Sequence, residues 1–246
     1  MAAFRILPAG DSALTFEFGN EISPAVNRSV KALYDFIEAH PIDGISETIP
    51  TFRSLSVIYD PRRISYEELC GKLRAAAEAM KQGRDSFSMV YHIPVCYGGE
   101  YGPDLGIVAA YACLTEDEVV RRHTSRTYLI YMLGFLPGFA YLGGLDPKIA
   151  TPRLPSPRTA IPAGAVGIGG EQTGIYPIAS PGGWNLIGRT PVRPYDPNRQ
   201  PPILYKAGDS IRFFSVDEQT YRDIAERVER GEYQLRTETI KNEAGA

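Results

Sequence analysis

The sequence predicts an α+β protein with two parts: an N-terminal layer of strands and helices, then a compact all-β unit. Three observations support this. Residues 1 to about 85 alternate short strands with two amphipathic helices. The composition changes near residue 95, where a glycine-rich loop begins. Residues 134–191 then hold 12 of the 24 glycines and 9 of the 20 prolines, interleaved with apolar and aromatic residues that disordered segments lack.

The N-terminal part is expected to run strand, strand, helix, strand, strand, helix. Period-two apolar patterns predict its strands over 4–7, 13–18, 45–50 and 55–59. The first helix begins at Pro24 with Ser23 as its N-cap. The second follows Ser65, which forms a capping box with Glu68, and is expected to end at Gly83. The apolar side of each helix packs on the sheet.

The C-terminal part is predicted to be mainly β, because dense glycine and proline favour tight turns between short strands. A strand over 87–95 precedes helices over 105–113 and 116–123, the second of which opens with a capping box of Thr115 and Glu118. Further strands are expected over 126–133, 165–169, 174–179, 185–190 and 210–214. A helix over 215–230 follows, and the polar tail after Arg236 is expected to be frayed.

Composition and missing motifs exclude several classes of function. The net charge of −3 gives no basic footprint for nucleic acid, and no apolar run approaches the ~20 residues of a membrane span. No signal peptide is apparent, and three cysteines without CxxC spacing predict buried thiols in a cytoplasmic protein. There is no phosphate-binding loop, and the histidines, His40, His92 and His123, lack metal-ligand spacing. We therefore expect no metal site, and no ATP binding by this chain alone.

A series of ordered motifs resembles the KipI/PxpB family, also called allophanate hydrolase subunit 1. The motifs are GFLPGF at 134–139, PAGAVGI at 162–168, EQTGIYP at 171–177 and SPGGW at 180–184. The upstream segments YGPDL at 101–105 and VRRHT at 120–124 match as well. The resemblance covers essentially the whole chain.

This resemblance implies an N-terminal α/β layer domain of ferredoxin-like type over residues 1–88 and a cyclophilin-like β-barrel over 89–246. It implies the B subunit of a 5-oxoprolinase, which cleaves 5-oxo-L-proline to L-glutamate together with the A and C subunits. ATP is then handled by the complex, and the chain alone is expected to be inactive. Two alternatives stay open: an inhibitor of a sporulation-type histidine kinase, and a carboxyltransferase-like module of a biotin-dependent urea carboxylase.

Polar residues within these motifs are the candidates for chemistry. His123, at the end of a short helix, is either a catalytic proton-transfer group or a cap facing the helix dipole. Glu171, Gln172 and Thr173 lie between glycines, where amide and hydroxyl groups can bind a lactam, although a polar turn explains them too. Asn185 is a further candidate for substrate binding, whereas Ser180 is expected only to form hydrogen bonds in a turn.

Aromatic and arginine side chains complete the predicted site. Tyr176 and Trp184 either floor a substrate pocket or belong to the barrel core, and the same alternatives apply to Tyr141. Arg189, and also Arg153 and Arg158, either pair with a substrate carboxylate or phosphate or lie solvated at the surface. For Arg153 and Arg158, which each follow a proline in a semi-rigid loop, a subunit interface is a further alternative. A partner interface with the C subunit is predicted at three aromatic residues, which are otherwise core: Phe135, Phe139 and Tyr141.

Overall fold

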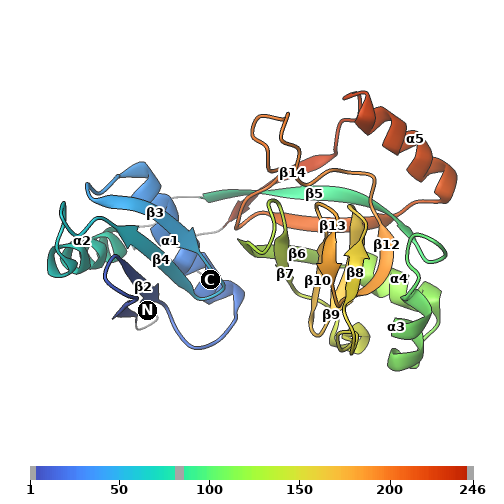
Figure 1. Cartoon of the computed structure of the whole chain (residues 1–246), viewed down its shortest axis with the longest axis horizontal. Helices are drawn as coiled ribbons and strands as arrows, with labels where there is room; N and C mark the ends of the chain where they lie inside the picture. The colour runs from blue at the N-terminus through green and yellow to red at the C-terminus, as the bar shows by residue number, and fades with distance from the viewer. Residues whose placement is uncertain (1–3, 81–85, 243–246) are drawn as a thin grey trace. The chain divides into compact units, whose positions relative to one another are not determined.

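The computed structural model describes residues 4–80 and 86–242, which fold as two compact units (Figure 1). The first unit comprises Met1–Phe87 with Lys241–Ala246, and the second comprises Ser88–Ile240. Each unit has its own hydrophobic core. The predicted α+β fold class is confirmed.

The first unit is an antiparallel sheet with two helices, α1 (Pro24–Ala39) and α2 (Tyr66–Ala79). The strand order is β1 (Arg5–Pro8), β2 (Ala13–Glu17), β4 (Ser54–Tyr59), β3 (Ile45–Pro50). Alternate residues of β4, beginning with Leu55, are buried and share one core with Leu33 of α1 and Leu69 of α2. Both helices therefore cover the same face of the sheet.

The predicted helix starts in this unit are confirmed by their capping hydrogen bonds. The Ser23 hydroxyl accepts from the Val26 N–H at 3.3 Å, and the Ser65 hydroxyl accepts from the Glu68 N–H at 3.2 Å. Helix α2 ends at Ala79, and its predicted end at Gly83 lies outside the described residues.

The second unit is a closed β-barrel (Figure 1). Around the barrel the strands are β12 (Asn185–Arg189), β9 (Ala165–Gly169), β10 (Gln172–Ile175), β7 (Ala140–Gly143), β6 (Thr127–Leu133), β13 (Ser210–Ser215) and β5 (Ser86–Tyr97). Cys96 and Tyr97 of β5 pair with β12 and close the ring. Strand β13 runs parallel to β5, and β14 (Thr237–Asn242) extends the sheet beyond β5. Closure leaves the barrel strands without an exposed edge.

Three helices and a small sheet accompany the barrel. Helix α3 (Leu105–Ala112) packs on β12 and α4 (Glu116–Thr124) packs on β13. The remaining elements are α5 (Glu218–Glu229), the short 3-10 helix η2 (Pro147–Ile149), and the two-stranded sheet of β8 (Arg158–Ile161) and β11 (Ser180–Gly182). As predicted, Thr115 caps α4 by accepting from the Glu118 N–H at 3.2 Å.

Some sequence predictions differ from the structure. Strands β7, β8 and β11 were not predicted, because four residues or fewer give little periodicity. The strand expected over 174–179 is Gln172–Ile175, since Pro177 has no N–H for a ladder. The last helix begins at Glu218, where Asp217 accepts from the Thr220 N–H, and the tail expected to be frayed forms β14.

Candidate functional site

His123 lies at the end of α4 with its ring inside the barrel. The residue is fully buried, and its ring stacks on Phe213 with 4.7 Å between centroids. Its Nδ1 lies 2.8 Å from the Tyr97 hydroxyl and its Nε2 lies 2.8 Å from the Thr173 hydroxyl. The ring therefore joins a helix to two barrel strands.

The direction of these hydrogen bonds follows from Thr173. Its hydroxyl donates to the Gly167 carbonyl at 2.9 Å, so its oxygen accepts from Nε2–H of His123. Nδ1 is then unprotonated and accepts from the Tyr97 hydroxyl. Burial lowers the pKa of His123 to about 3, so the ring is neutral at pH 7. This geometry favours a positioning role, and the catalytic role of His123 stays a prediction.

The predicted group Glu171, Gln172 and Thr173 is divided between the surface and the core. Glu171 is exposed at the turn between β9 and β10, and Gln172 is half-buried at the start of β10. Thr173 is fully buried against His123. The lactam-binding role of this group stays a prediction, and in this structure only Glu171 and Gln172 have access to solvent.

Tyr176 and Trp184 belong to an aromatic cluster together with Phe139. The Trp184 ring centroid lies 5.6 Å from that of Phe139 and 6.2 Å from that of Tyr176. All three residues are at most 4% exposed. A Cβ built on Gly169 would lie 2.3 Å from Trp184 Cδ1, so the indole packs directly on the backbone of β9. Of the two alternatives for these aromatic residues, the positions favour barrel core.

Asn185 holds the loop that carries Arg153. Its side-chain amide donates to the Pro152 carbonyl at 2.8 Å and to the Ile168 carbonyl at 3.2 Å. Two residues further on, the Leu154 N–H donates to the Gly183 carbonyl at 2.7 Å. The side chain of Asn185 thus uses both amide protons on the protein, and its predicted contact with substrate stays a prediction.

Arg153 and Arg158 approach the aromatic cluster from this loop. The exposed Arg153 places its guanidinium carbon 5.9 Å from the centre of the Trp184 ring. Arg158 donates to the carboxylate of Asp104 at 2.6 Å, and Asp104 also accepts from the Leu186 N–H at 2.7 Å. Asp104 was not predicted as a site residue, although it falls within the YGPDL motif.

Arg189 has different neighbours. Its guanidinium carbon lies 5.9 Å from the centre of the Tyr101 ring, and its charge also acts on Tyr221 in α5. Burial raises the pKa of Tyr221, and the charge of Arg189 lowers it in part. Arg189 therefore contacts different residues from those that surround Arg153 and Trp184. Its role in substrate binding stays a prediction.

The three aromatic residues of the predicted interface do not share one environment. Phe139 is 3% exposed within the aromatic cluster, so its predicted place at a surface interface is not supported. Tyr141 is half-buried. Phe135 is 63% exposed at the tip of a turn, with a left-handed φ of 68° that a non-glycine residue rarely adopts. Phe135 is the member of this set best placed to meet a partner.

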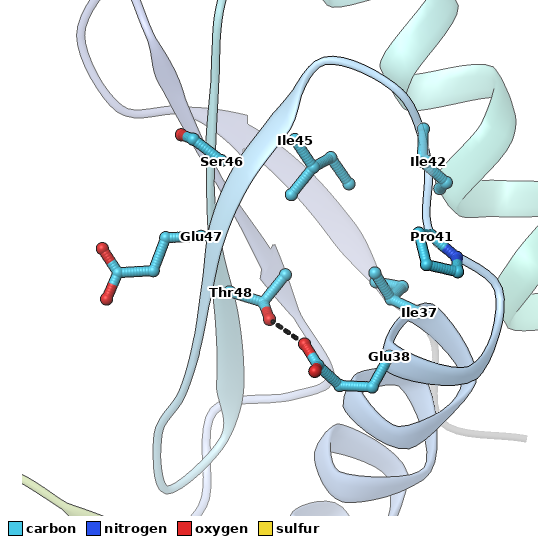
Figure 2. Close-up of a pocket in the computed structure, with 8 residues that line it drawn as sticks. All are labelled: Ile37, Glu38, Pro41, Ile42, Ile45, Ser46, Glu47 and Thr48. Atoms are coloured by element: carbon cyan, nitrogen blue, oxygen red, sulfur yellow. Dashed lines mark hydrogen bonds between the residues drawn. The ribbon is translucent and has the colours of Figure 1, made fainter.

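The first unit carries a recess of about 200 Å³, and none of the candidate residues named above lines it (Figure 2). Glu38 and Glu47 supply its charges, and the Thr48 hydroxyl donates to the Glu38 carboxylate at 3.1 Å. Apolar walls come from Ile37, Pro41, Ile42 and Ile45. With two carboxylates and no cationic side chain in its lining, this recess does not suit an anionic substrate.

Within residues 4–80 and 86–242, no cluster of three or more histidine, cysteine or acidic residues has the geometry of a metal site. In the same ranges, no helix is long and apolar enough to cross a membrane. Cys70 and Cys96 are buried as expected, whereas Cys113 is exposed at the end of α3, where the expected burial was wrong.

Comparison with known proteins defines the class of this chain. The family described as carboxyltransferase domain, subdomain C and D, matches residues 4–205. The 5-oxoprolinase B subunit of Bacillus subtilis is 44% identical over 89% of this chain and 95% of its own length. That of Escherichia coli O157:H7 is 40% identical over 87% of this chain and 96% of its own length. The chain belongs to the KipI/PxpB family within this carboxyltransferase class, as its motifs predicted.

Solved structures agree with this assignment. The crystal structure of TTHA0988 has a TM-score of 0.76 and 38% identity over 83% of this chain, which corresponds to 40% of that longer chain. The structure of PH0987 from Pyrococcus horikoshii has 46% identity over 88% of this chain and all of its own, with a TM-score of 0.53. The urea carboxylase of Kluyveromyces lactis, at 23% identity and a TM-score of 0.76, shares the fold.

Proposed function

We propose that this chain is the B subunit of a cytoplasmic, ATP-dependent 5-oxoprolinase. The observation that carries the proposal is identity of 40% or more with two bacterial 5-oxoprolinase B subunits over at least 87% of this chain. Because that similarity includes both units, it supports a common function rather than a common fold alone.

The reaction converts 5-oxo-L-proline, ATP and two molecules of water into L-glutamate, ADP and phosphate. A lactam is a resonance-stabilised amide, and ATP hydrolysis supplies the driving force for opening it. The relatives are named as B subunits, which implies further subunits, and we propose that these are the A and C subunits. ATP binds elsewhere in the complex, and the site around Trp184 contributes to holding the lactam acid.

Reconstitution tests this proposal. The chain is co-expressed with the proteins encoded beside it, the complex is purified, and glutamate release from 5-oxo-L-proline is measured with and without ATP. We expect ATP-dependent glutamate that disappears when this chain is omitted, and no activity from the chain alone. A stable complex that releases no glutamate would count against the assignment.

A second candidate is a carboxyltransferase module, which the family description and the 25% identical urea amidolyase of Saccharomyces cerevisiae favour. That function requires a biotinylated partner to deliver the carboxyl group. Streptavidin blotting of the purified complex separates the two candidates. A biotinylated partner protein, together with carboxylation of urea, would favour the second.

A further inference from the structure

Two buried polar atoms next to the aromatic cluster have no hydrogen-bond partner. They are the Ser180 hydroxyl, in a residue 8% exposed, and Nη1 of Arg158. Leaving a buried donor unpaired costs about 1–3 kcal/mol, and native proteins seldom tolerate it without a reason. A ligand that accepts from both donors would provide one.

The sheet register places Ser180 and Arg158 on the same side of the small sheet. Ser180 lies opposite Ile161 and Gly182 lies opposite Arg158, with a register shift between the two pairs. Directly opposed residues project to the same face, and Ser180 and Gly182, two residues apart on β11, share that face. A Cβ on Gly182 would lie 2.5 Å from the Tyr176 hydroxyl and 2.7 Å from Ile161, so this face looks toward Tyr176.

Arg153 approaches the aromatic cluster from the loop that Asn185 holds. Its guanidinium carbon lies 5.9 Å from the centre of the Trp184 ring, whose centroid is 6.2 Å from that of Tyr176. The positive charges of Arg153 and Arg158 also act to lower the pKa of Tyr176, against the larger effect of burial. Among the described residues, no carboxylate lies within ion-pair distance of Arg153. The hydrogen bonds from Asn185 and Leu154 hold this loop in place before any ligand arrives.

We infer that Arg153, Arg158 and the Ser180 hydroxyl form a binding site for a small monocarboxylate beside Trp184. The charges match: two guanidinium groups and the carboxylate of Asp104 leave a local charge of about +1, which one carboxylate neutralises and a dianion exceeds. Asp104 keeps Arg158 in position, and Ser180 donates the third hydrogen bond. That the acid is 5-oxo-L-proline rests on the proposed 5-oxoprolinase function.

The single tryptophan makes binding directly measurable. Trp184 fluorescence of the full-length chain is followed during titration with 5-oxo-L-proline, with 2-pyrrolidinone as the lactam without a carboxylate, and with inorganic phosphate. We expect a saturable change with 5-oxo-L-proline only. Arg153→Gln and Ser180→Ala are expected to weaken binding tenfold or more, whereas Arg212→Gln, at an exposed arginine of β13, leaves it unchanged. No saturable response, an equal response to phosphate, or equal effects of all three substitutions would overturn the inference.

Activity of the reconstituted complex separates this inference from the proposed function. If the complex is active and Arg153→Gln and Ser180→Ala raise KM tenfold with little change in kcat, both ideas stand. If it is active and their KM equals that of Arg212→Gln, the carboxylate site is wrong and the function stands. If it is inactive although the chain binds the acid through Arg153, the site stands and the function is wrong.

Discussion

Two groups of buried polar side chains in the second unit differ in how completely their hydrogen bonds are satisfied. In the group around His123, each proton from Tyr97 through the ring to Thr173 has an acceptor. In the group around Arg158, the Ser180 hydroxyl and one guanidinium nitrogen have none. A complete network fixes a fold, whereas an incomplete one at the surface of a core leaves groups for a ligand. The exposed fractions of residues such as His123 and Ser180 alone would not distinguish the two groups.

The largest effect is expected where the network is complete. His123→Ala removes a stacked ring and leaves Thr173 and Tyr97 without their partner, so we expect it to lower the free energy of unfolding by about 3–5 kcal/mol. Urea denaturation followed by Trp184 fluorescence measures the loss in this unit. His40→Ala, at an exposed histidine of the first unit, is the control and should change stability by less than about 0.5 kcal/mol. If His123→Ala had little effect on stability but a large effect on kcat of the complex, the result would support a catalytic role for His123.

The same histidine predicts a pH dependence. Its pKa is about 3 when folded and near 6.5 when unfolded, so between these values the unfolded chain binds the extra proton. Stability contributed by the neutral ring is therefore complete above pH 6.5 and is lost as the pH falls. We expect a loss of about 2 kcal/mol from pH 6.5 to pH 5.

Unfolding curves for wild type and His123→Gln over this range isolate that contribution. The glutamine variant should lack it, because the two proteins share every other ionisable side chain. Equal pH slopes in the two proteins would mean that His123 is accessible to protons in the folded state.

A smaller effect is expected from Asn185, which holds the Arg153 loop against β9. Asn185→Ala removes its hydrogen bonds to Pro152 and Ile168 and should destabilise the unit by about 1–2 kcal/mol. In the complex it should also raise KM for the carboxylate substrate, since Arg153 loses its fixed position. Asn198→Ala, at an exposed asparagine, serves as the matched control for both measurements.

The smallest effect, and one of opposite sign, is expected from Ser180→Ala. Because the hydroxyl has no partner, its removal should leave stability unchanged or raise it by up to about 1 kcal/mol. Thermal unfolding of the ligand-free chain measures this. A clear loss of stability would indicate that the hydroxyl has a partner within the protein, and it would weaken the distinction drawn between the two groups.

Local chemistry in the sequence predicted much of the fold. The caps at Ser23, Ser65 and Thr115 each form the expected hydrogen bond, because capping depends on residues three apart. Strand β9 lies where its apolar run placed it, at Ala165–Gly169. Strands β8 and β11 were missed because they are too short to show periodicity, and β14 was missed because its partner β5 is distant in the sequence.

The site was less predictable for a related reason. The sequence identified Arg153, Arg158 and Trp184 as candidates, but whether an arginine is paired depends on neighbours such as Asp104, 54 residues away. His123 lies in a distinctive sequence motif, but only the structure shows that its two ring nitrogens form hydrogen bonds with Tyr97 of β5 and Thr173 of β10. Unsatisfied atoms, such as the Ser180 hydroxyl, cannot be identified before the chain is folded.

The way the barrel closes also has a consequence for biosynthesis. The ring closes only when residues 96–97 pair with residues 188–189, which are synthesised much later. Strand β5 also pairs with β13, which begins at Ser210. In the first unit, in contrast, the pairings among the described strands β1 to β4 lie within residues 5–59. On the ribosome, this sheet can therefore form while the second unit is still being made. During that interval the long β5 strand has neither barrel neighbour, and it is the segment most in need of protection from aggregation.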